Sequence, residues 1–227
     1  MSSKSKVSVI IPAYNEEKTI RQTIQGVRHC CSNVLVVLAK RSSDKTEEIV
    51  KSMKVPYFKD RGLGKGDGMR FAIQKVNDGI IVFMDSDGSH IPKDIPKLVR
   101  PILKGEADMV IGSRFLGGSE ELHGDFNKFL RMFFSMCIAQ IINWRFRTTI
   151  MDTQNGFRAI DAKVAKKLNL VSNHTEVETE MIMKCFKKNY KIFEVPSREL
   201  KRKYGKSSIN LWKHAWRYIW IVIKNLF

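Results

Sequence analysis

Short, uninterrupted runs of aliphatic and β-branched residues recur along this chain, and they constrain its fold more than any other feature. The run at residues 80–84 contains five apolar residues in succession. Runs of this kind are typical of strands that are buried on both faces of a parallel sheet. Because helical patterns separate the runs, the chain predicts repeated β-α-β units. We therefore expect an α/β fold with a mostly parallel, Rossmann-like sheet flanked by helices.

The remaining elements follow from the same periodicities. The expected strands are residues 7–11, 34–38, 55–58, 80–84 and 109–114. The expected helices are residues 16–29, a helix capped by Asp44, and residues 69–76, 126–144 and 210–227. Asn15 is the expected N-cap of the first helix, and Glu47 completes a capping-box pattern with Asp44. This predicts one domain over residues 1–209, including a hydrophobic interface helix region at 126–150, and then a basic amphipathic helix at 210–227.

Two carboxylates, Asp85 and Asp87, directly follow the run at 80–84. Ligands of open α/β sheets bind outside the carboxyl ends of the strands. Side chains at i and i+2 of an extended segment point the same way, so this pair can converge on one cation. Mg²⁺ or Mn²⁺ is typically held by one or two carboxylates and the phosphates of a substrate. The other interpretation is a strand-to-loop turn with two solvated acids, and the pair alone does not decide.

A glycine-rich turn precedes the helix expected at 69–76. Its glycines, at positions 62, 64, 66 and 68, match neither the P-loop order nor the G-x-G-x-x-G spacing. Glycines that simply form a turn are the simpler interpretation of this stretch. Arg61 and Lys65, beside bare backbone amides, would nevertheless suit a diphosphate.

The chain is strongly basic, with a formal net charge of +17. From residue 184 onward, twelve Lys and Arg stand against two acids. Such an excess suits nucleic acid, an anionic membrane or a phosphorylated ligand, unless it is a solvated lysine-rich face. Segments 126–144 and 210–227 combine aromatic and aliphatic residues with scattered basic ones, a pattern typical of helices in a membrane interface. Packing on the sheet or in a dimer contact is their other interpretation.

Three observations bear on location. The four cysteines show neither metal-type spacing nor a disulfide framework, which indicates a reducing compartment. The first six residues lack the apolar core of a secretory signal. No run of about 18 apolar residues is present that could cross a bilayer. We therefore expect a peripheral membrane protein at the cytoplasmic face.

Several motifs, in this order along residues 7–210, resemble family 2 glycosyltransferases. They are Pro12-Ala13-Tyr14-Asn15-Glu16-Glu17, Ser43-Asp44-Lys45-Thr46, Gly64-Lys65-Gly66 and Asp85-Ser86-Asp87. Four further motifs resemble the branch of dolichyl-phosphate mannose synthase and polyprenyl-phosphate glucosyltransferases. They are Gly112-Ser113-Arg114-Phe115, Gly156-Phe157-Arg158-Ala159, Glu194-Val195-Pro196, and Arg202 with Gly205-Lys206-Ser207-Ser208.

The resemblance implies a GT-A fold and an inverting, metal-dependent transfer of a hexose to a polyprenyl or dolichyl phosphate. The implied donor is a nucleotide-diphosphate sugar of the UDP-glucose or GDP-mannose type. Implied nucleotide-sugar contacts are Pro12, Tyr14, Glu16, Lys65, Asp85 and Ser86, and implied metal ligands are Asp85, Asp87 and Ser89. Implied catalytic residues are Asp87, Arg114 and Arg131, and implied acceptor-phosphate contacts are Arg114, Arg131, Arg158, Arg202 and Ser207.

The chemical nature of the acceptor decides whether the enzyme needs a general base. A phosphate is already ionised near pH 7 and requires no general base, whereas a sugar hydroxyl would require one, for which Asp152 or Glu180 would be candidates.

One position departs from the family pattern. Relatives carry a nucleotide-contacting acid after the second strand, but Leu38 or Ala39 stands there in this chain. The preferred nucleotide base is therefore left open.

Two alternatives come from other classes of protein. A haloacid-dehalogenase-type phosphatase also places D-x-D-G-[ST] after an apolar strand, with Asp85 as nucleophile and Asp87 as acid. That interpretation leaves the motifs at 12–17 and 64–66 unexplained. A basic nucleic-acid-binding domain, or a degenerate transferase-like binding protein, would account for the charge, but no nucleic-acid-binding motif is present. We therefore expect no nucleic-acid partner.

Overall fold

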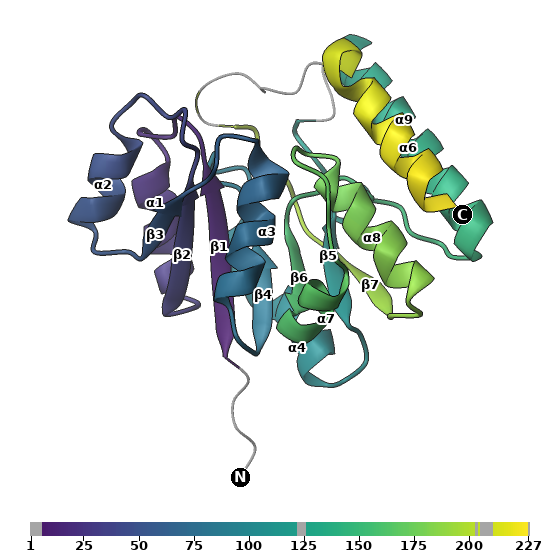
Figure 1. Ribbon diagram of the computed structural model, residues 1–227, viewed down its shortest axis with the longest axis horizontal. Helices are drawn as coiled ribbons and strands as arrows, with labels where there is room; N and C mark the ends of the chain where they lie inside the picture. Colours follow the sequence, from purple (N-terminus) through teal and green to yellow (C-terminus); the bar gives the residue numbers. More distant parts are fainter. Residues whose placement is uncertain (1–5, 122–125, 203, 205–210, 227) are drawn as a thin grey trace.

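The computed structural model describes residues 6–121, 126–202, 204 and 211–226. Within these residues a seven-stranded sheet has the order β3-β2-β1-β4-β6-β5-β7 (Figure 1). The strands are β1 (Val7–Ala13), β2 (Asn33–Leu38), β3 (Tyr57–Lys59), β4 (Ile80–Phe83), β5 (Met109–Ser113), β6 (Arg158–Asp161) and β7 (Ile192–Pro196). Neighbouring strands are parallel except at β6, which is antiparallel to both β4 and β5. The predicted mostly parallel sheet is confirmed.

Helices cover both faces of the sheet. They are α1 (Ile20–Arg28), α2 (Thr46–Ser52), α3 (Lys65–Lys75), η1 (Pro92–Asp94), α4 (Ile95–Leu103), α5 (Arg114–Gly117), α6 (Phe126–Phe146), α7 (Ala162–Lys167), α8 (Val177–Lys187) and α9 (Leu211–Leu226). One core layer joins α1, α2 and α4 to one face, and the other joins α3, α7 and α8 to the opposite face. Figure 1 shows this three-layer arrangement, with α6 and α9 side by side outside α8.

The central strand β4 shows why the apolar runs form this sheet. Ile81 and Phe83 belong to the core layer of α3 and α8, while Ile80 and Val82 belong to the layer of α1 and α4. Successive side chains of a strand point to opposite faces, so a strand between two helical layers needs apolar residues at every position. All four side chains are buried, and each contributes roughly 1.5–3 kcal/mol by leaving water.

The helix that follows β1 begins later than predicted. It starts at Ile20 rather than at residue 16, and Asn15 is not its N-cap. Asn15 instead has a left-handed backbone, with φ of 53°. Its side-chain oxygen accepts a hydrogen bond from the backbone N–H of Ser43, 2.9 Å away. Asparagine tolerates this conformation better than most residues because its short polar side chain bonds locally. Asn15 therefore joins two loops instead of starting a helix.

The starts of α2 and α3 also differ in detail from the prediction. Asp44 accepts a hydrogen bond from the backbone N–H of Thr46, as a capping residue does. Glu47, however, does not return to the helix start, because it pairs with Lys51 and Lys59. Helix α3 begins at Lys65, four residues before the predicted start.

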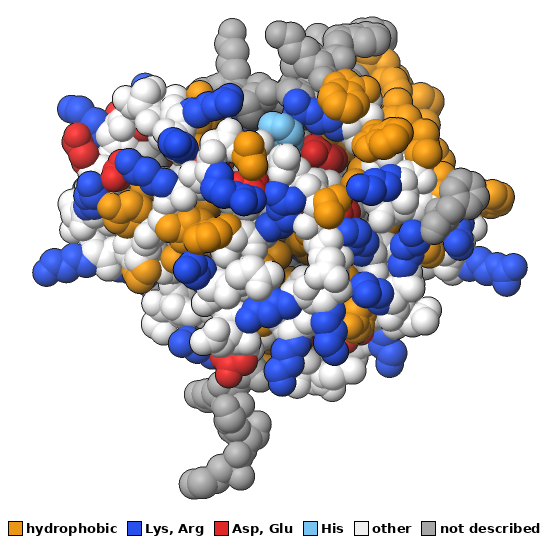
Figure 2. Space-filling model, viewed as in Figure 1, with side chains coloured by type: hydrophobic (Ala, Val, Ile, Leu, Met, Phe, Trp, Pro, Cys, Tyr) orange, Lys and Arg blue, Asp and Glu red, His pale blue; other side chains and the backbone are white. Residues whose placement is uncertain are grey.

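The pair α6 and α9 carries most of the large apolar side chains that remain exposed on the helices. On α6 they are Phe129, Phe133, Phe134, Met136, Ile141 and Trp144, and on α9 they are Trp216, Ile219, Trp220 and Ile223. We call these ten side chains the apolar face. In Figure 2, orange side chains gather over these two helices. No helix in the described part of the chain is long and apolar enough to cross a membrane.

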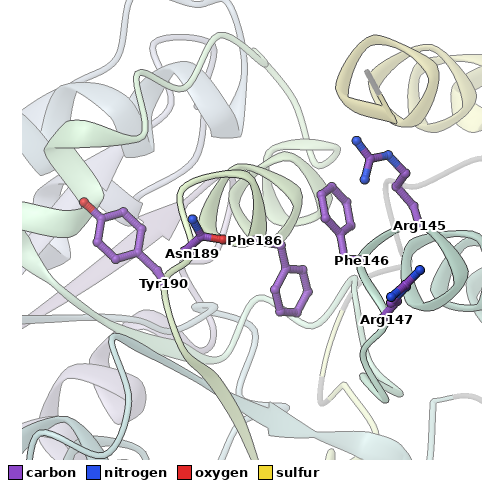
Figure 3. A pocket seen from close by; sticks show the side chains of 6 residues that line it. All are labelled: Arg145, Phe146, Arg147, Phe186, Asn189 and Tyr190. Atoms are coloured by element: carbon purple, nitrogen blue, oxygen red, sulfur yellow. The ribbon is translucent and has the colours of Figure 1, made fainter.

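A cavity of about 580 Å³ lies where α6 and α8 end (Figure 3). Its lining residues are Arg145, Phe146, Arg147, Phe186, Asn189 and Tyr190. A second cavity, of about 670 Å³, shares Tyr190 with the first. It is also lined by Lys166, Lys167, Asn169 and Lys188.

Candidate active site

The loop that follows β4 is held in shape by a buried histidine. The backbone N–H of Asp85 donates to Nδ1 of His90, 3.1 Å away, so the other ring nitrogen, Nε2, carries the proton. Nε2 lies 3.1 Å from Oδ1 of Asn155. The imidazole also stacks on Phe157, with ring centroids 5.0 Å apart. Sequence reasoning did not single out His90 or Asn155, whose roles depend on contacts between distant segments.

Ser86 ties the same loop to neighbouring elements. Its hydroxyl donates to the carbonyl of Pro12 at the end of β1, 2.8 Å away. Its own carbonyl accepts a hydrogen bond from Thr23 of α1. The side chain of Ser86 is therefore used to position the loop between Asp85 and Asp87.

Lys65 joins Asp85 to a buried glutamate. Its Nζ lies 2.6 Å from Asp85 Oδ1 and 2.9 Å from Glu178 Oε1. Burial alone would lower the pKa of Lys65, but the charges of Asp85 and Glu178 outweigh it and raise that pKa. The pKa of Asp85 is lowered, because Lys65 outweighs the effect of burial. The pKa of Glu178 is raised, chiefly by burial. Sequence reasoning missed Glu178, which lies on α8, 93 residues after Asp85.

Asp87 has its two carboxylate oxygens in different environments. Oδ1 accepts from the backbone N–H of Ser89 at 3.0 Å and from the Ser89 hydroxyl at 2.7 Å. Oδ2 lies 2.7 Å from the guanidinium of Arg202. Ser89 was predicted as a metal ligand, and in this structure its hydroxyl supports Asp87.

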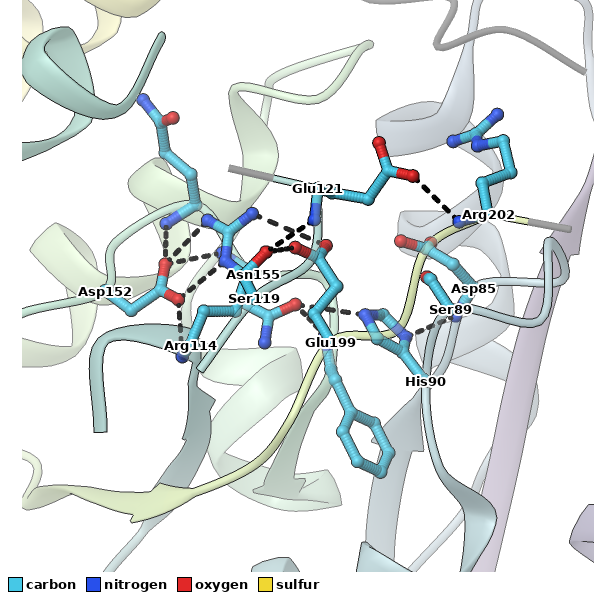
Figure 4. A network of polar contacts seen from close by, with 12 residues as sticks. Asp85, Ser89, His90, Arg114, Ser119, Glu121, Asp152, Asn155, Glu199 and Arg202 are labelled. Atoms are coloured by element: carbon cyan, nitrogen blue, oxygen red, sulfur yellow. Dashed lines mark hydrogen bonds and ion pairs between the residues drawn. The ribbon is translucent and has the colours of Figure 1, made fainter. Parts of the chain in front are cut away.

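The segment after β7, which carries Glu199 and Arg202, crosses the carboxyl edge of the sheet (Figure 4). This course brings Arg202 to Asp87. The backbone N–H of Leu200 donates to the carbonyl of Ser89. The backbone N–H of Arg202 donates to Glu121, 2.8 Å away. On the other side, Glu199 contacts Ser119 and lies 3.6 Å from Arg114. This segment was predicted only as a motif, without a position.

The end of β1 supplies the remaining predicted donor contacts. Tyr14 is 53% exposed beyond the end of the strand and free to stack on a planar ligand. Burial, together with the nearby charges of Asp87 and Asp85, raises the pKa of Glu16 above its usual value, against a hydrogen bond from Thr19. Glu16 thus lies in the negative potential of the same two aspartates.

Arg114 follows β5 and forms a bidentate pair with a fully buried carboxylate. Its Nε and one terminal nitrogen lie 2.8 and 2.9 Å from the two oxygens of Asp152. Glu194 in turn accepts the backbone N–H groups of Met151 and Asp152. Asp152 raises the pKa of Arg114 against the effect of burial, so the cation is fixed and largely neutralised.

The other predicted acceptor residues have different surroundings. Arg131 lies half-buried on α6 and pairs with no acid in the described residues. Arg158 is completely buried and donates to the carbonyls of Asn155 and Glu178, which makes it a support for the fold. Ser207 lies outside the described residues. The structure adds Ser135, one turn after Arg131, whose buried hydroxyl has no partner among the described residues.

A carboxylate occupies the neighbourhood of Ala39, where the family pattern expects an acid. Oδ1 of Asp60, which follows β3, accepts the backbone N–H groups of Lys40 and Gly62, both at 2.8 Å. Strands β2 and β3 are adjacent and parallel, so their carboxyl ends meet at one edge. The chain thus places an acid here from the next strand along.

The loop before α8 packs tightly on the glycine-rich turn. A Cβ at Gly66 would lie 2.5 Å from the carbonyl oxygen of Ser172 and 2.7 Å from that of His174. Only glycine allows this approach. The same loop reaches α9, because Oη of Tyr218 lies 2.8 Å from the Thr175 hydroxyl. Lys65 is therefore positioned by a loop that also contacts α9.

Comparisons with known proteins agree with this arrangement. The model of the family described as "Glycosyl transferase family 2" matches residues 8–168. An uncharacterized protein of Methanocaldococcus jannaschii is 34% identical over 212 residues, which cover 90% of this chain and 86% of the relative. The UDP-N-acetylglucosamine–dolichyl-phosphate N-acetylglucosaminyltransferase of Methanococcus voltae is 25% identical over 223 residues, covering 88% and 87% of the two chains.

Solved structures share the fold. Glucosyl-3-phosphoglycerate synthase from Mycobacterium tuberculosis, in complex with Mn²⁺, UDP and phosphoglyceric acid, matches with a TM-score of 0.74. The two sequences are 19% identical, and the match covers 98% of this chain and 79% of the other.

The chain belongs to glycosyl transferase family 2. It is a glycosyltransferase with the GT-A fold, and its resemblance to the dolichyl-phosphate branch is confirmed. Family membership sets aside the phosphatase interpretation of Asp85 and Asp87.

Proposed function

We propose that this enzyme transfers a hexose from a nucleotide-diphosphate sugar to a polyprenyl phosphate at a membrane surface. The observation that carries the proposal is the edge formed by Asp85 and Asp87, with Lys65 and Arg202 beside them. Carboxylates and cations gathered at the carboxyl ends of strands suit a diphosphate with its counter-ion. The relative from Methanococcus voltae acts, by its name, on dolichyl phosphate.

The residues present fit a divalent cation, Mg²⁺ or Mn²⁺. No group of three or more His, Cys, Asp or Glu in the described residues could hold a metal by itself. Two aspartates with the donor's diphosphate oxygens would complete a coordination shell of hard ligands. Asp85 and Asp87 would hold the ion, and the raised pKa of Glu16 is consistent with negative potential there. When bound, the ion would neutralise charge on the leaving diphosphate.

An acceptor that needs no base fits this site best. The two acids considered as general bases, Asp152 and Glu180, are fully buried and engaged. Asp152 is bound to Arg114, and Glu180 to the backbone N–H groups of residues 171 and 172 and to Lys184. A phosphate acceptor is already ionised near pH 7 and needs only to be positioned.

Arg131 and Arg202 are the proposed acceptor-phosphate contacts, with Ser135 as a further donor. Arg131 and Ser135 are four residues apart on α6 and therefore share one side of the helix. Arg114 would contribute positive charge without contacting the acceptor phosphate directly, because its guanidinium already pairs with Asp152. Arg158 is left out of this set, since its guanidinium is used within the core.

Asp60 is the proposed substitute for the missing acid at Ala39. Its carboxylate would receive the nucleobase at the edge of β2 and β3, with Tyr14, which follows β1, available to stack on it. The nucleotide that binds will identify the preferred nucleobase.

The apolar face of α6 and α9 is the proposed membrane contact. Its tryptophans would lie at the level of the lipid headgroups, with basic residues beside them. A lipid-linked phosphate would then reach Arg131 from the membrane plane. The domain division at residue 209 belongs to this proposal, with α9 as the membrane-apposed helix.

Donor binding is tested by thermal unfolding with UDP, GDP and other nucleotides, each with and without Mn²⁺. A bound nucleotide raises the melting temperature by mass action, and the responding base names the donor. Transfer is then measured from the matching sugar nucleotide to a polyprenyl phosphate and to a neutral polyprenol. No melting shift with any nucleotide, or equal transfer to the neutral polyprenol, would contradict the proposal.

Membrane contact is tested by replacing Trp216 and Trp220 with serine. These side chains are exposed, so the fold is expected to survive, and co-sedimentation with vesicles should fall to background. The matched control replaces Leu103 and Phe193, which are exposed apolar residues of α4 and β7. Equal vesicle binding by the two variants would exclude the apolar face as the contact.

A further inference from the structure

Five cations surround the two adjoining cavities that share Tyr190. They are Arg145, Arg147, Lys166, Lys167 and Lys188. No Asp or Glu lines either cavity. Within the described residues, none of the five pairs with a carboxylate. A concave surface lined by charge of one sign concentrates ions of the opposite sign.

These cavities lie away from the candidate active site. Asp161, directly before α7, pairs with Ile80 at the amino end of β4, whereas Asp85 follows the carboxyl end of that strand. Ile192, after α8, likewise pairs with Met109 at the amino end of β5. The five cations therefore belong to a second site and not to the donor site.

Helix ends explain only part of this charge. The cations lie at the C-terminal ends of α6, α7 and α8, where positive charge complements the helix dipoles. Each helix end carries about half a unit of negative charge, or about 1.5 units for three ends. Five cations exceed that requirement. An anion from outside the chain would offset the surplus.

Contacts within the fold position one side of this site. Phe146 and Phe186 stack, with ring centroids 5.6 Å apart, and form one wall (Figure 3). The guanidinium of Arg145 lies 5.1 Å from the centre of the Phe146 ring, and its Nε donates to the carbonyl of Leu226. Arg147 has a left-handed backbone, with φ of 54°, that is uncommon for a residue with a side chain. Arg145 is thus fixed in advance of binding.

We propose that these cavities bind the phosphate headgroup of an anionic membrane lipid. Trp144, directly before Arg145, is 81% exposed and ends the apolar face on α6. Arg131 lies 14 residues before Arg145, which is about 21 Å along the helix. If α6 lies in the membrane plane, the acceptor and a second, anionic lipid are bound at the two ends of one helix. The inference rests on the membrane contact of the proposed function and not on its chemistry.

The test compares a double variant, Arg147→Gln with Lys188→Gln, with the wild-type chain. Co-sedimentation is measured on phosphatidylcholine vesicles with and without one-fifth phosphatidylglycerol, at fixed salt. A matched control, Lys93→Gln with Arg100→Gln, removes the same charge from η1 and α4. A charge-preserving variant, Arg147→Lys with Lys188→Arg, separates charge from shape.

The double variant should lose about tenfold or more of its partitioning onto anionic vesicles, since each basic residue at a membrane contributes severalfold. The control and the charge-preserving variant should stay within about twofold of the wild-type chain. Binding to pure phosphatidylcholine should be unchanged. Equal losses in the double variant and the control would overturn the site.

Two further measurements separate the possible outcomes. Soluble glycerol phosphate serves as the second probe in thermal unfolding. Stabilisation of the wild-type chain but not of the double variant, without any difference on vesicles, would assign the cavity to a soluble phosphate and overturn the lipid assignment. Nucleotide binding is measured on all variants and should be unaffected. The vesicle measurement therefore tests the lipid site independently of sugar transfer.

Discussion

Arg202 lies 2.7 Å from Asp87, and this ion pair joins the segment after β7 to the carboxylates after β4. The Asp87 side chain is 8% exposed and that of Arg202 is 26% exposed. The same carboxylate is a proposed ligand of the divalent cation. Arginine and metal ion would therefore compete for Asp87, unless Arg202 turns toward the acceptor phosphate when the donor binds.

Arg202→Ala should lower the Mn²⁺ concentration needed for half-maximal nucleotide stabilisation. A partly exposed ion pair contributes roughly 0.2–1 kcal/mol, so the expected change is up to about fivefold. Transfer to polyprenyl phosphate should fall at the same time, because an acceptor contact is lost. The measurement is a Mn²⁺ titration by thermal unfolding at fixed nucleotide. Arg198→Ala, in the same segment but paired with Glu120, is the control, and identical titrations for both variants would refute competition.

Asp87→Ala should reduce transfer by about 100-fold or more, because charge on the leaving diphosphate would lose its principal stabilisation. The fold should remain, as judged by circular dichroism. Nucleotide stabilisation should also become independent of Mn²⁺. Asp78→Ala, which removes an exposed acid just before β4, is the control. Turnover close to that of the control would rule out the metal role of Asp87.

Lys65→Met should destabilise the fold by about 3 kcal/mol, because it leaves the buried carboxylate of Glu178 without its nearest cation. The loss is read from urea unfolding. Adding Glu178→Gln to Lys65→Met should restore more than half of it, since the uncompensated charge is then gone. If the double variant is as unstable as Lys65→Met alone, the loss comes from packing rather than from charge.

Stability should fall in acid through groups such as Asp152. Burial acts to raise its pKa, but Arg114 outweighs this and lowers it below the ordinary value of 3.8. Such a carboxylate stabilises the fold above pH 3.8, and the contribution is lost as pH falls through the lower, folded pKa. The contribution of Asp152 to the unfolding free energy should therefore be nearly flat above about pH 5 and decline below pH 3.8. Asp152→Asn should lower stability at pH 7 and flatten that decline, whereas Asp78→Asn should leave the slope unchanged.

The sequence predicted the inner strands β4 and β5 because they are buried on both faces. Unbroken apolar runs such as residues 80–84 have few other interpretations. It did not predict β7, in which no position is buried. Nor did it predict β6, whose short sequence Arg158–Asp161 begins with a charged residue. That strand is antiparallel and lies between β4 and β5, an order that depends on tertiary contacts. The start of α1 was missed for a similar reason, since Asn15 bonds to a distant loop.

The sequence predicted those residues of the candidate site that belong to recognisable motifs. Asp85, Asp87 and Lys65 were named, and the structure brings them to one edge of the sheet. Glu178, His90 and Asp60 were not named, because each acts through a partner that is far away in sequence or on another strand. The segment containing Arg202 could be placed only when its hydrogen bonds with Glu121 and Ser89 were known.

The hydrogen bond between Tyr218 and Thr175 has a thermodynamic consequence. Through it, α9 contacts the loop that packs on Gly66, and Lys65 of the same turn holds Asp85. If lipid binding by α9 biases that loop, sugar-nucleotide affinity must change as well, and linkage requires the effect to be reciprocal. The factor by which a membrane changes donor affinity would equal the factor by which the donor changes membrane affinity. The enzyme would then sense, at its donor site, whether an acceptor surface is present.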